Sequence, residues 1–590
     1  MPAILPISEA PLIRRFVVKR FRGLHEFEWR PAPGLNVILG GGDVGKTTIL
    51  EAIALLLSPT TSSVLSDADY WDRKSEDGFE IEAVMSLTDE CGINQQTKQA
   101  WPWDWNGKEP ILPGTEQSAG EVARPETPVY RLRVSGNSDY ELAYELVQPD
   151  GTTSHLAVAV RRSIGLVRLG GDDRNDRDLR LVQGSALDRL LSDATLRSRL
   201  GKLLGDADVE EGLKDEAKQK LEQLNAAFQT RALPSELGLA LMSGQGLSIG
   251  ALVGLTADRH GVSLPLASWG SGTRRLSSLE IAAAHQAGSA ITVVDEVERG
   301  LEPYRLRGLI GRLQDSKYQV FLTTHSSVAI SAANKASLWY LDSSGAIGSL
   351  PKDRISRHQK RDPETFLARL TIVAEGECEK GFLHRLFERA SDSTFRERGI
   401  WVTEAGGNDS SLDLLETLAG SGMLFGGFVD DEGRDPQRWK ALTTRLGKLL
   451  FRWDQGCLEQ NIIKHIPADR LEKFIEDLEG DSGDRRRTLA DRLGLPGDKS
   501  FAAIRTKAPD LHALIIDAAM GVVPDAIADK GEKKQFKEHQ KKWFKSYEGG
   551  RELADKVFSF GVWPHIKDRL LPFLNAVRAI DGLPPLSDLP

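Results

Sequence analysis

The chain has 590 residues, of which 40% are hydrophobic and 27% charged, and its net charge is −9. This length exceeds what one hydrophobic core usually supports, so we expect two or more domains, while the acidic balance argues against uniform coating by nucleic acid. The sequence has no apolar run of about 18 residues and no signal-peptide pattern at its amino terminus, so we expect a cytoplasmic protein that does not contact a membrane.

The first predicted elements are strands that lead into a glycine-rich loop. Apolar residues at 13–24 and 26–39 follow strand patterns, and the second segment ends directly at GGGDVGKTTILEAIALLL. Residues 40–47 fit the pattern GxxxxGK[ST]. The order of strand, glycine loop and helix therefore predicts a phosphate-binding loop rather than an ordinary glycine-rich turn.

The residues of this loop have separate chemical tasks. Around Gly40 and Gly45 the backbone N–H groups turn towards phosphate oxygens, Lys46 reaches the terminal phosphates, and Thr47 ligates Mg²⁺. The following helix, which includes Thr48, points the positive end of its dipole at the anion. We therefore predict an ATP site that holds one Mg²⁺ ion.

Short apolar runs and turn residues alternate through the next part of the chain. The runs at 79–87, 128–135, 140–147 and 155–162 predict an antiparallel sheet, and 88–127 predicts a long loop within it. From about 180 to 235 the chain is rich in charge with apolar residues at helical spacing. This segment predicts a helical insertion, which is a candidate dimerisation element.

A second apolar strand supplies the acids that a phosphate-binding loop requires. In SAITVVDEVERG, Asp295 follows the strand and can support Mg²⁺ through water, while Glu296 is placed to orient or deprotonate the attacking water. His325 ends the next strand and is a candidate sensor of the γ-phosphate, although a lone histidine there is more often structural.

The order of these motifs resembles an ABC-type ATPase head. The sequence SWGSGTRRL is a loose version of that family's signature, with Ser268 and Gly270 in the serine and glycine positions, and Gly42 stands where related heads usually carry asparagine. The resemblance implies that two heads sandwich ATP, so that the signature of one head caps the γ-phosphate held by the other. It therefore implies a homodimer or a higher homo-oligomer formed through the heads.

A second α/β pattern follows a charged segment. Apolar periodicity is lost at 350–366, which predicts a linker, and strands then alternate with helices, which predicts a parallel sheet. We therefore predict an α/β protein with an ATPase domain at 1–365 and a second domain at 366–590.

Acidic residues follow two strands of the second domain. Glu375 and Glu379 come directly after one strand, and Asp430 and Glu432 follow another, where pleating allows these two to point the same way. Several carboxylates that converge on one cavity are best explained by bound divalent cations. The alternative is ordinary surface charge at strand ends.

This arrangement resembles the Toprim fold from about Leu370 onward. The resemblance implies two Mg²⁺ or Mn²⁺ ions that break or make phosphodiester bonds, with Glu375 as ligand and base and with Glu379, Asp430 and Glu432 as ligands. Glu459 is a candidate ligand of the second metal. Glu432 stands where the family usually has aspartate, so Asp431 can take its role.

A cation near the scissile phosphate completes such a site. Lys545 is the preferred candidate, since a compact ammonium can neutralise charge that develops on the phosphate. Lys541 and Lys542 are its rivals.

An ABC-type head joined to a Toprim domain resembles the OLD (overcoming lysogenization defect) nucleases of class 2, on the motifs VAEGECEKGFL, VDDEG, CLEQNI and KSYEGGRELA. The resemblance implies an ATP-regulated, metal-dependent DNA endonuclease or nickase in anti-phage defence or DNA processing, with a UvrD-like helicase as an expected partner. Two alternatives remain open: an ATP-driven DNA-binding switch with a degenerate Toprim scaffold, and a nuclease directed at RNA. The chain lacks the coiled-coil arms of a chromosome clamp, and no room remains for a topoisomerase strand-passage domain.

Overall fold

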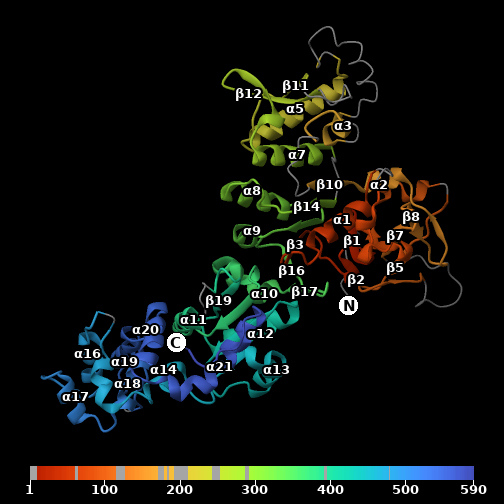
Figure 1. Cartoon of the computed structure of the whole chain (residues 1–590). Helices are drawn as coiled ribbons and strands as arrows, with labels where there is room; N and C mark the ends of the chain where they lie inside the picture. The colour runs from red at the N-terminus through yellow and green to blue at the C-terminus, as the bar shows by residue number, and fades with distance from the viewer. Residues whose placement is uncertain are drawn as a thin grey trace. The chain divides into compact units, whose positions relative to one another are not determined.

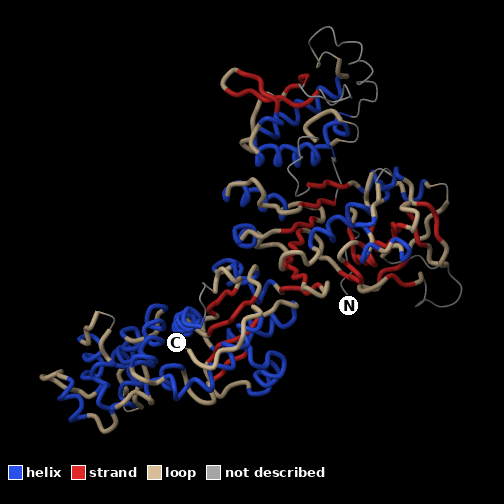
Figure 2. The backbone as a smooth tube through the Cα atoms, viewed as in Figure 1, coloured by secondary structure: helices blue, strands red, loops and turns tan. Residues whose placement is uncertain are grey.

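The computed structural model consists of two compact units, Met1–Ser349 and Leu350–Pro590 (Figure 1). The structure describes residues 10–59, 64–96, 98–113, 127–169, 178–182, 185–191, 210, 212–241, 253–285, 291–390, 395–477, 479–525 and 527–589. Both units combine helices and strands (Figure 2), so the predicted mixed α/β class is confirmed. Among the described residues, no helix is both long enough and apolar enough to cross a bilayer.

A six-stranded sheet organises the nucleotide side of the first unit. Its order is β10-β14-β15-β3-β16-β17, and the neighbours from β10 to β16 pair in parallel. The strands are almost continuously apolar, as buried parallel strands are. They are β3 (Leu35–Gly40), β10 (Leu166–Leu169), β14 (Ile291–Val294), β15 (Val320–Thr323), β16 (Ser337–Leu341) and β17 (Ile347–Leu350), and α8 (Pro303–Gln314) and α9 (Ser327–Ala332) lie between them in sequence.

The second sheet of this unit is antiparallel, as predicted, although two details differ. Its strands are β1 (Leu12–Phe21), β2 (Leu24–Trp29), β4 (Phe79–Ser86), β5 (Trp103–Trp105), β6 (Pro110–Ile111), β7 (Pro128–Gly136), β8 (Leu142–Val147) and β9 (Thr153–His155). The predicted loop at 88–127 thus contributes β5 and β6 to the sheet, and its residues 114–126 lie outside the described residues. The predicted strand at 155–162 is largely the helix α2 (Val158–Ile164), because Val160 and Ile164 are buried four residues apart on one helical face.

Helix α1 (Lys46–Leu56) lies between the two sheets. It contacts β3, β14 and β15 of the parallel sheet and β1, β4 and β7 of the antiparallel sheet. Ile49, Ile53 and Leu56 are fully buried in the core that both sheets share. This packing fixes the amino terminus of α1, where the glycine loop ends.

The region predicted as a helical insertion at 180–235 contains helices where it is described. They are α3 (Ala186–Leu191) and α5 (Asp215–Thr230), and both pack on α7 (Ser271–His285). The small sheet β11 (Gly238–Leu241), β12 (Val253–Arg259) and β13 (Val262–Pro265) follows. Residues 192–209 lie outside the described residues, and the dimerisation role stays a prediction.

The second unit contains the predicted parallel sheet. Its order is β19-β18-β20-β21, with every neighbouring pair parallel, so the carboxyl ends of all four strands lie at one edge. The strands are β18 (Leu370–Ala374), β19 (Ile400–Glu404), β20 (Phe425–Val429) and β21 (Leu450–Arg452), flanked by α11 (Glu377–Ala390), α12 (Asn408–Ser421), α13 (Pro436–Leu446) and α14 (Leu458–Ile463).

The predicted linker is an ordered helix of the second unit. Helix α10 (Lys352–Arg361) buries Ile355, His358 and Gln359, and it packs on α12. These three positions form one helical face. The sequence pattern did not indicate this helix, because most residues around these positions are charged. The division of the chain therefore falls between Ser349 and Leu350, before the predicted boundary after residue 365.

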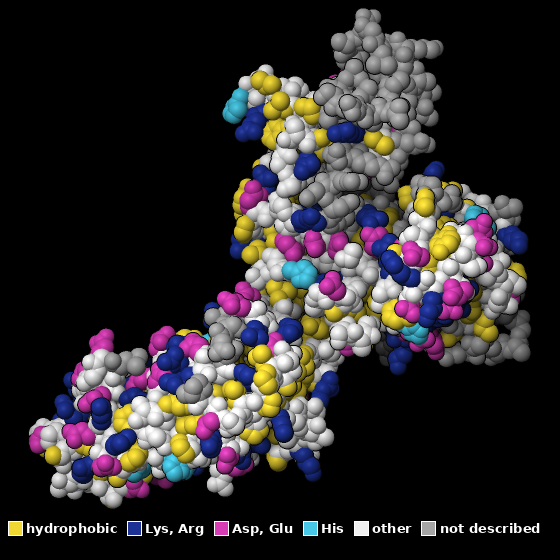
Figure 3. Space-filling model, viewed as in Figure 1, with side chains coloured by type: hydrophobic (Ala, Val, Ile, Leu, Met, Phe, Trp, Pro, Cys, Tyr) yellow, Lys and Arg dark blue, Asp and Glu magenta, His cyan; other side chains and the backbone are white. Residues whose placement is uncertain are grey.

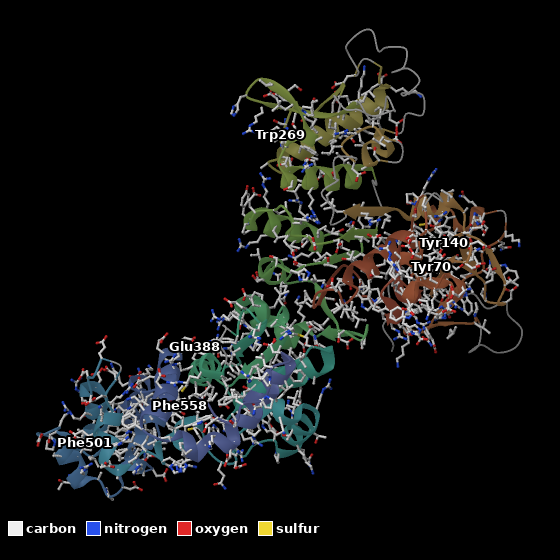
Figure 4. All side chains as sticks on the ribbon, in the orientation of Figure 1. Tyr70, Tyr140, Trp269, Glu388, Phe501 and Phe558 are labelled. Atoms are coloured by element: carbon white, nitrogen blue, oxygen red, sulfur yellow. The ribbon has the colours of Figure 1, made fainter. Side chains whose placement is uncertain are left out.

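The rest of the second unit is helical, with α15 (Leu471–Phe474), α16 (Gly483–Arg492), α17 (Phe501–Lys507), α18 (Leu511–Met520), α19 (Lys530–Glu538), α20 (Tyr547–Ser559) and α21 (Trp563–Ile580). Helices α11 and α20 touch through glycines: a Cβ on Gly381 would lie 1.9 Å from Tyr547 O, and one on Gly550 would lie 2.0 Å from Cys378 O. Figure 4 labels Glu388 on α11 and Phe558 on α20, the two helices of this contact. The close approach determines where the chain before α20 meets the sheet edge.

Candidate functional site

The phosphate loop of the first unit has the geometry that its sequence predicts. Gly40 has a φ of +149°, and a Cβ there would lie 2.5 Å from Leu341 O, so only glycine fits. Lys46 is buried and donates hydrogen bonds to Gly40 O (3.1 Å) and Gly41 O (2.5 Å). Burial lowers the pKa of Lys46, while Asp295 opposes that shift. An ammonium held inside the loop is positioned for a polyphosphate.

The acidic strand end predicted to serve this loop lies beside it. Thr47 Oγ1 donates to Asp295 Oδ2 at 3.0 Å, and Thr323 Oγ1 donates to Asp295 Oδ1 at 2.5 Å. Arg275 donates to the backbone carbonyl of Asp295. The structure therefore brings together Lys46, Thr47 and Asp295, while Thr48 lies half-buried in the first turn of α1.

Glu296 and His325 occupy the loops that follow β14 and β15. Glu296 has a φ of 45°, a left-handed conformation that is uncommon for a non-glycine residue, and its N–H donates to Thr323 Oγ1 at 2.8 Å. His325 is exposed, and its N–H donates to Glu298 Oε1 at 2.7 Å. Sequence reasoning missed Glu298, which also accepts from Thr324 Oγ1 at 2.6 Å.

The predicted signature residues lie just before helix α7. Ser268 ends a short 3₁₀ turn and donates to Pro265 O at 2.7 Å, and Gly270 precedes the helix. The helix itself begins at Ser271 and Gly272, and a Cβ on Gly272 would lie 2.1 Å from Gly300 O. The N–H groups at the start of α7 therefore belong to Ser271 and Gly272, which sequence reasoning did not select.

In the second unit, Glu375 connects three strand ends of the sheet. Its N–H donates to Phe428 O, its carbonyl accepts from the N–H groups of Gly406 and Gly407, and its carboxylate oxygen Oε2 accepts from Asp430 N at 3.1 Å. Asn408 Nδ2 donates to the same Oε2 at 3.0 Å and to Asp430 O at 3.1 Å. Glu375 and Asp430 are thus neighbours, as the sequence predicts, and Asn408 is a residue that it missed.

Three buried carboxylates gather beside Glu375. Candidate ligand atoms of Cys378, Glu379 and Glu459 lie within 4.8 Å of one another, and so do those of Asp430, Cys457 and Glu459. Glu459 is fully buried, its Oε1 lies 2.7 Å from Lys545 Nζ, and its Oε2 has no hydrogen-bond partner among the described residues. We call Glu379, Asp430 and Glu459 the acidic cluster.

Ionisation of the carboxyl groups in the acidic cluster is unfavourable. Burial raises the pKa of Glu379, and the charge of Glu459 raises it further. Burial likewise raises the pKa of Asp430, with further contributions from Glu379 and Glu375. Lys545 is one positive charge beside three carboxylates, so the raised pKa values and the unpartnered Oε2 of Glu459 fit a further, divalent cation.

Lys545 is the cation that reaches the acidic cluster. Its Nζ lies 2.7 Å from Glu459 Oε1, and its side chain is 31% exposed. Burial lowers the pKa of Lys545, but the charges of Glu459 and Glu379 outweigh that effect and raise the pKa overall, so the ammonium form persists. Lys541 pairs instead with Glu538 at 3.2 Å, and Lys542 pairs with Asp484 at 2.8 Å.

Glu432 is not brought into the acidic cluster. Its side chain is 40% exposed and lies 3.6 Å from Arg434 Nε. Strand β20 ends at Val429, so the alternation that would align Glu432 with Asp430 does not continue. Asp431 forms an ion pair with Arg452 rather than joining the acidic cluster.

The amino-acid sequence matches one family model. Residues 134–331, a segment that includes Asp295, Glu296 and His325, match the family described as "AAA domain, putative AbiEii toxin, Type IV TA system". This part of the chain belongs to an ATPase domain. The match supports the predicted use of ATP, and it ends before the second unit begins.

Comparison with curated protein sequences gives no match. Solved structures that align with the chain include an Smc head bound to the C-winged helix domain of ScpA (14% identity, 58% of this chain and 99% of that chain, TM-score 0.36). They also include an Smc head with an extended coiled coil bound to the C-terminal domain of ScpA from Pyrococcus furiosus (13%, 59% and 98%, TM-score 0.36). A third is the recombination mediator RecF-ATPrS of the RecFOR pathway (12%, 58% and 99%, TM-score 0.33).

Proposed function

We propose that the protein is a divalent-metal-dependent DNA endonuclease or nickase that its ATPase domain regulates. The observation that carries this proposal is the convergence of Glu379, Asp430 and Glu459, from three separate segments, with Lys545 beside them. ATP hydrolysis in the first unit does not require a buried group of carboxylates with a lysine in the second unit. The resemblance of this unit's motifs to Toprim enzymes and to class 2 OLD nucleases supports the same reading.

The donor set of the acidic cluster fits hard divalent cations. Carboxylate oxygens are the ligands that Mg²⁺ and Mn²⁺ prefer, so Glu379, Asp430 and Glu459 would hold the metal with Glu375 at its edge. Two such ions, when bound, activate water and stabilise the leaving oxygen of a phosphodiester. The thiols of Cys378 and Cys457 lie beside these oxygens, but burial raises the pKa of both, so they stay protonated and the carboxylates would be the ligands.

The remaining chemistry belongs to the chain itself. Lys545 stays protonated and supplies a fixed positive charge where a scissile phosphate gains negative charge. Glu375 is held by Asn408 and by the N–H of Asp430, so its free oxygen Oε1 is oriented towards one side and can accept a proton from water. Asn408 is thereby a positioning residue for this base.

The ATPase domain supplies the control. We place ATP and its Mg²⁺ at Lys46, Thr47 and Asp295, with Glu296 and His325 acting on the γ-phosphate. An ABC-type arrangement, in which the start of α7 in one copy caps the nucleotide of another, makes the protein a homodimer or higher homo-oligomer. The helical insertion is then the candidate surface for contact between copies.

DNA binding must come from particular groups rather than from overall charge. The chain is acidic, and Figure 3 shows Lys and Arg side chains interspersed with Asp and Glu over the visible face of the second unit. Anti-phage defence is the role that the OLD resemblance and the toxin-related family description both favour, with a UvrD-like helicase as a partner.

Plasmid nicking tests the proposal. The full chain is incubated with supercoiled plasmid and with a structured RNA, with Mg²⁺ or Mn²⁺, and with or without ATP. We expect metal-dependent conversion of the plasmid to open circles. Cutting of RNA alone would assign the site to an RNA nuclease, and binding of DNA without cutting under any of these conditions, with and without a helicase, would identify a DNA-binding switch instead.

A further inference from the structure

A polar pocket in the second unit lies outside the acidic cluster. Its volume is about 230 Å³, and its lining includes Trp453, Asn461, Lys464, His465, His565 and Arg569. Asp454 is the one carboxylate of the lining, its side chain is 79% exposed, and it pairs with Arg569. The lining therefore carries two permanent positive charges against one carboxylate that is already engaged.

The rings of the lining restrict what the pocket can hold. Trp453 is 5% exposed and its indole Nε1–H is itself buried, so this ring forms a wall of the pocket and supplies no donor to a ligand. His465 and His565 stack with ring centroids 4.8 Å apart and an interplanar angle of 3°. Parallel rings at this spacing direct their nitrogens outward in separate planes, so they do not converge on one metal ion, but each can donate to an anion.

The pocket adjoins the acidic cluster through one short helix. Asn461 is in α14 and Lys464 caps its carboxyl end on the same side, three positions later, whereas Glu459 is two residues before Asn461 and so lies about 200° around the helix. The two sites are therefore separated by roughly the width of a helix, about 10 Å. A chain of contacts also connects the pocket to the strand end that carries Asp430. Arg569 donates to Arg452 O at 2.8 Å, and Arg452 pairs with Asp431, the residue after Asp430.

We infer that this pocket binds a backbone phosphate of the nucleic acid whose neighbouring phosphodiester lies at the acidic cluster. The inference rests on the proposed nuclease function. Lys464 and the two imidazoles supply the donors, and Arg569 remains paired with Asp454 as a second positive charge. A phosphate diester matches donors that surround a small pocket, and a strand held there cannot slide away from the acidic cluster. The burial of His465 and the nearby charges of His565 and Lys464 lower its pKa, which fits a site that awaits an anion.

DNA binding without metal isolates this pocket from the acidic cluster. Fluorescence anisotropy of a fluorescein-labelled 12-nucleotide DNA is measured with the full chain in EDTA over a series of KCl concentrations. We expect Lys464→Gln/His565→Asn to weaken binding about tenfold and to reduce the slope of log affinity against log salt by about one, as loss of one phosphate contact does.

The matched control is Lys440→Gln, which also removes one lysine charge, from an exposed position of the same unit outside this pocket. Equal affinity and equal salt slope in the pocket and control variants, with unchanged unfolding curves, would overturn the inference. Inorganic phosphate is the second probe: if it binds the wild type but not the pocket variant while DNA affinity is the same in both, the pocket serves a free anion and the inference fails. If the pocket variant binds DNA like the control and still nicks plasmid, the phosphate pocket is rejected and the proposed nuclease function stands. If DNA binding depends on the pocket but the wild type never nicks plasmid, the phosphate pocket stands and the proposed nuclease function is rejected.

Discussion

The ammonium of Lys545 lies 2.7 Å from the carboxylate of Glu459, although Glu459 is in α14 and Lys545 is in the turn before α20. Lys545 is two residues before the start of α20, and α20 meets α11 where Gly550 faces the backbone of Cys378. Glu379 lies one residue after Cys378 on α11. The glycine contact thus places Lys545 close to Glu379, and Glu459 of α14 completes the group.

A side chain at this contact should separate the two helices. Gly550→Ala places a Cβ 2.0 Å from Cys378 O, which is backbone and cannot move aside cheaply. We expect a loss of about 3 kcal/mol in the free energy of unfolding, as overpacking produces, measured by urea denaturation of the second unit. Gly420→Ala is the matched control, since Gly420 lies in α12 with nothing within 4 Å of its added Cβ, and it should be neutral or slightly stabilising. Equal stability of the two variants would show that the close approach is not required.

Two glutamates near the sheet edge should behave differently in cleavage. Glu459→Gln removes the fully buried carboxylate and should reduce the plasmid-nicking rate by about 100-fold or more. Glu432→Gln removes an exposed carboxylate that pairs with Arg434, so its rate should stay within about threefold of wild type, as the small energy of exposed ion pairs implies. A large loss of nicking in Glu432→Gln with little change in Glu459→Gln would show that Glu432, and not Glu459, belongs to the site.

The acidic cluster should make stability depend on pH. Folding raises the pKa of Glu379 to about 7 and that of Asp430 to about 9, so the folded state binds more protons than the unfolded chain. Without metal, the contribution of these two groups to stability is therefore greatest at low pH and is lost as pH rises from about 4, the ordinary carboxyl value, through these folded values.

Mn²⁺ should reverse this loss. Because metal binds the deprotonated carboxylates, Mn²⁺ at 100 times its Kd should add about 2.7 kcal/mol at pH 8.5 and much less at pH 6. Unfolding curves at both pH values, with and without Mn²⁺, provide the measurement. Glu379→Gln/Asp430→Asn should remove both the pH dependence and the metal effect, and a metal effect equal at the two pH values would argue against these ligands.

The nucleotide site should be separable from the acidic cluster. Lys46→Ala removes an ammonium that points into the phosphate loop and should weaken ATP binding by about 2–3 kcal/mol, or roughly 30–150-fold. Titration with a fluorescent ATP analogue checks this, and Lys335→Ala, which changes an exposed lysine of the same unit, should bind ATP like wild type. Loss of Mn²⁺ binding by Lys46→Ala in the absence of nucleotide would contradict the independence of the two sites.

Local sequence patterns predicted the parts of both sites that follow directly from strand ends. Lys46 and Asp295 end up together because a glycine loop and an acidic strand end lie at the same edge of a parallel sheet. Glu375 and Asp430 meet for the same reason in the second sheet. In each case the strand order alone brings the side chains close.

Other features depend on contacts that no local pattern encodes. Asn408 approaches Glu375 only because α12 starts at the same sheet edge, and Glu298 reaches His325 across two loops. The expectation for Glu432 was wrong because β20 ends at Val429, before the acidic run. The sequence predicted a linker where α10 lies at 352–361, because most of its residues are charged and only a few of them pack against the rest of the unit.

Mn²⁺ binding to the full chain without nucleotide tests the central claim most directly. Electron paramagnetic resonance can count bound ions in wild type, in Lys46→Ala and in Glu379→Gln/Asp430→Asn/Glu459→Gln. We expect bound Mn²⁺ in wild type and in Lys46→Ala, and loss of that binding in the triple variant, whose retained fold is checked by circular dichroism. Equal Mn²⁺ binding by wild type and the triple variant would contradict it.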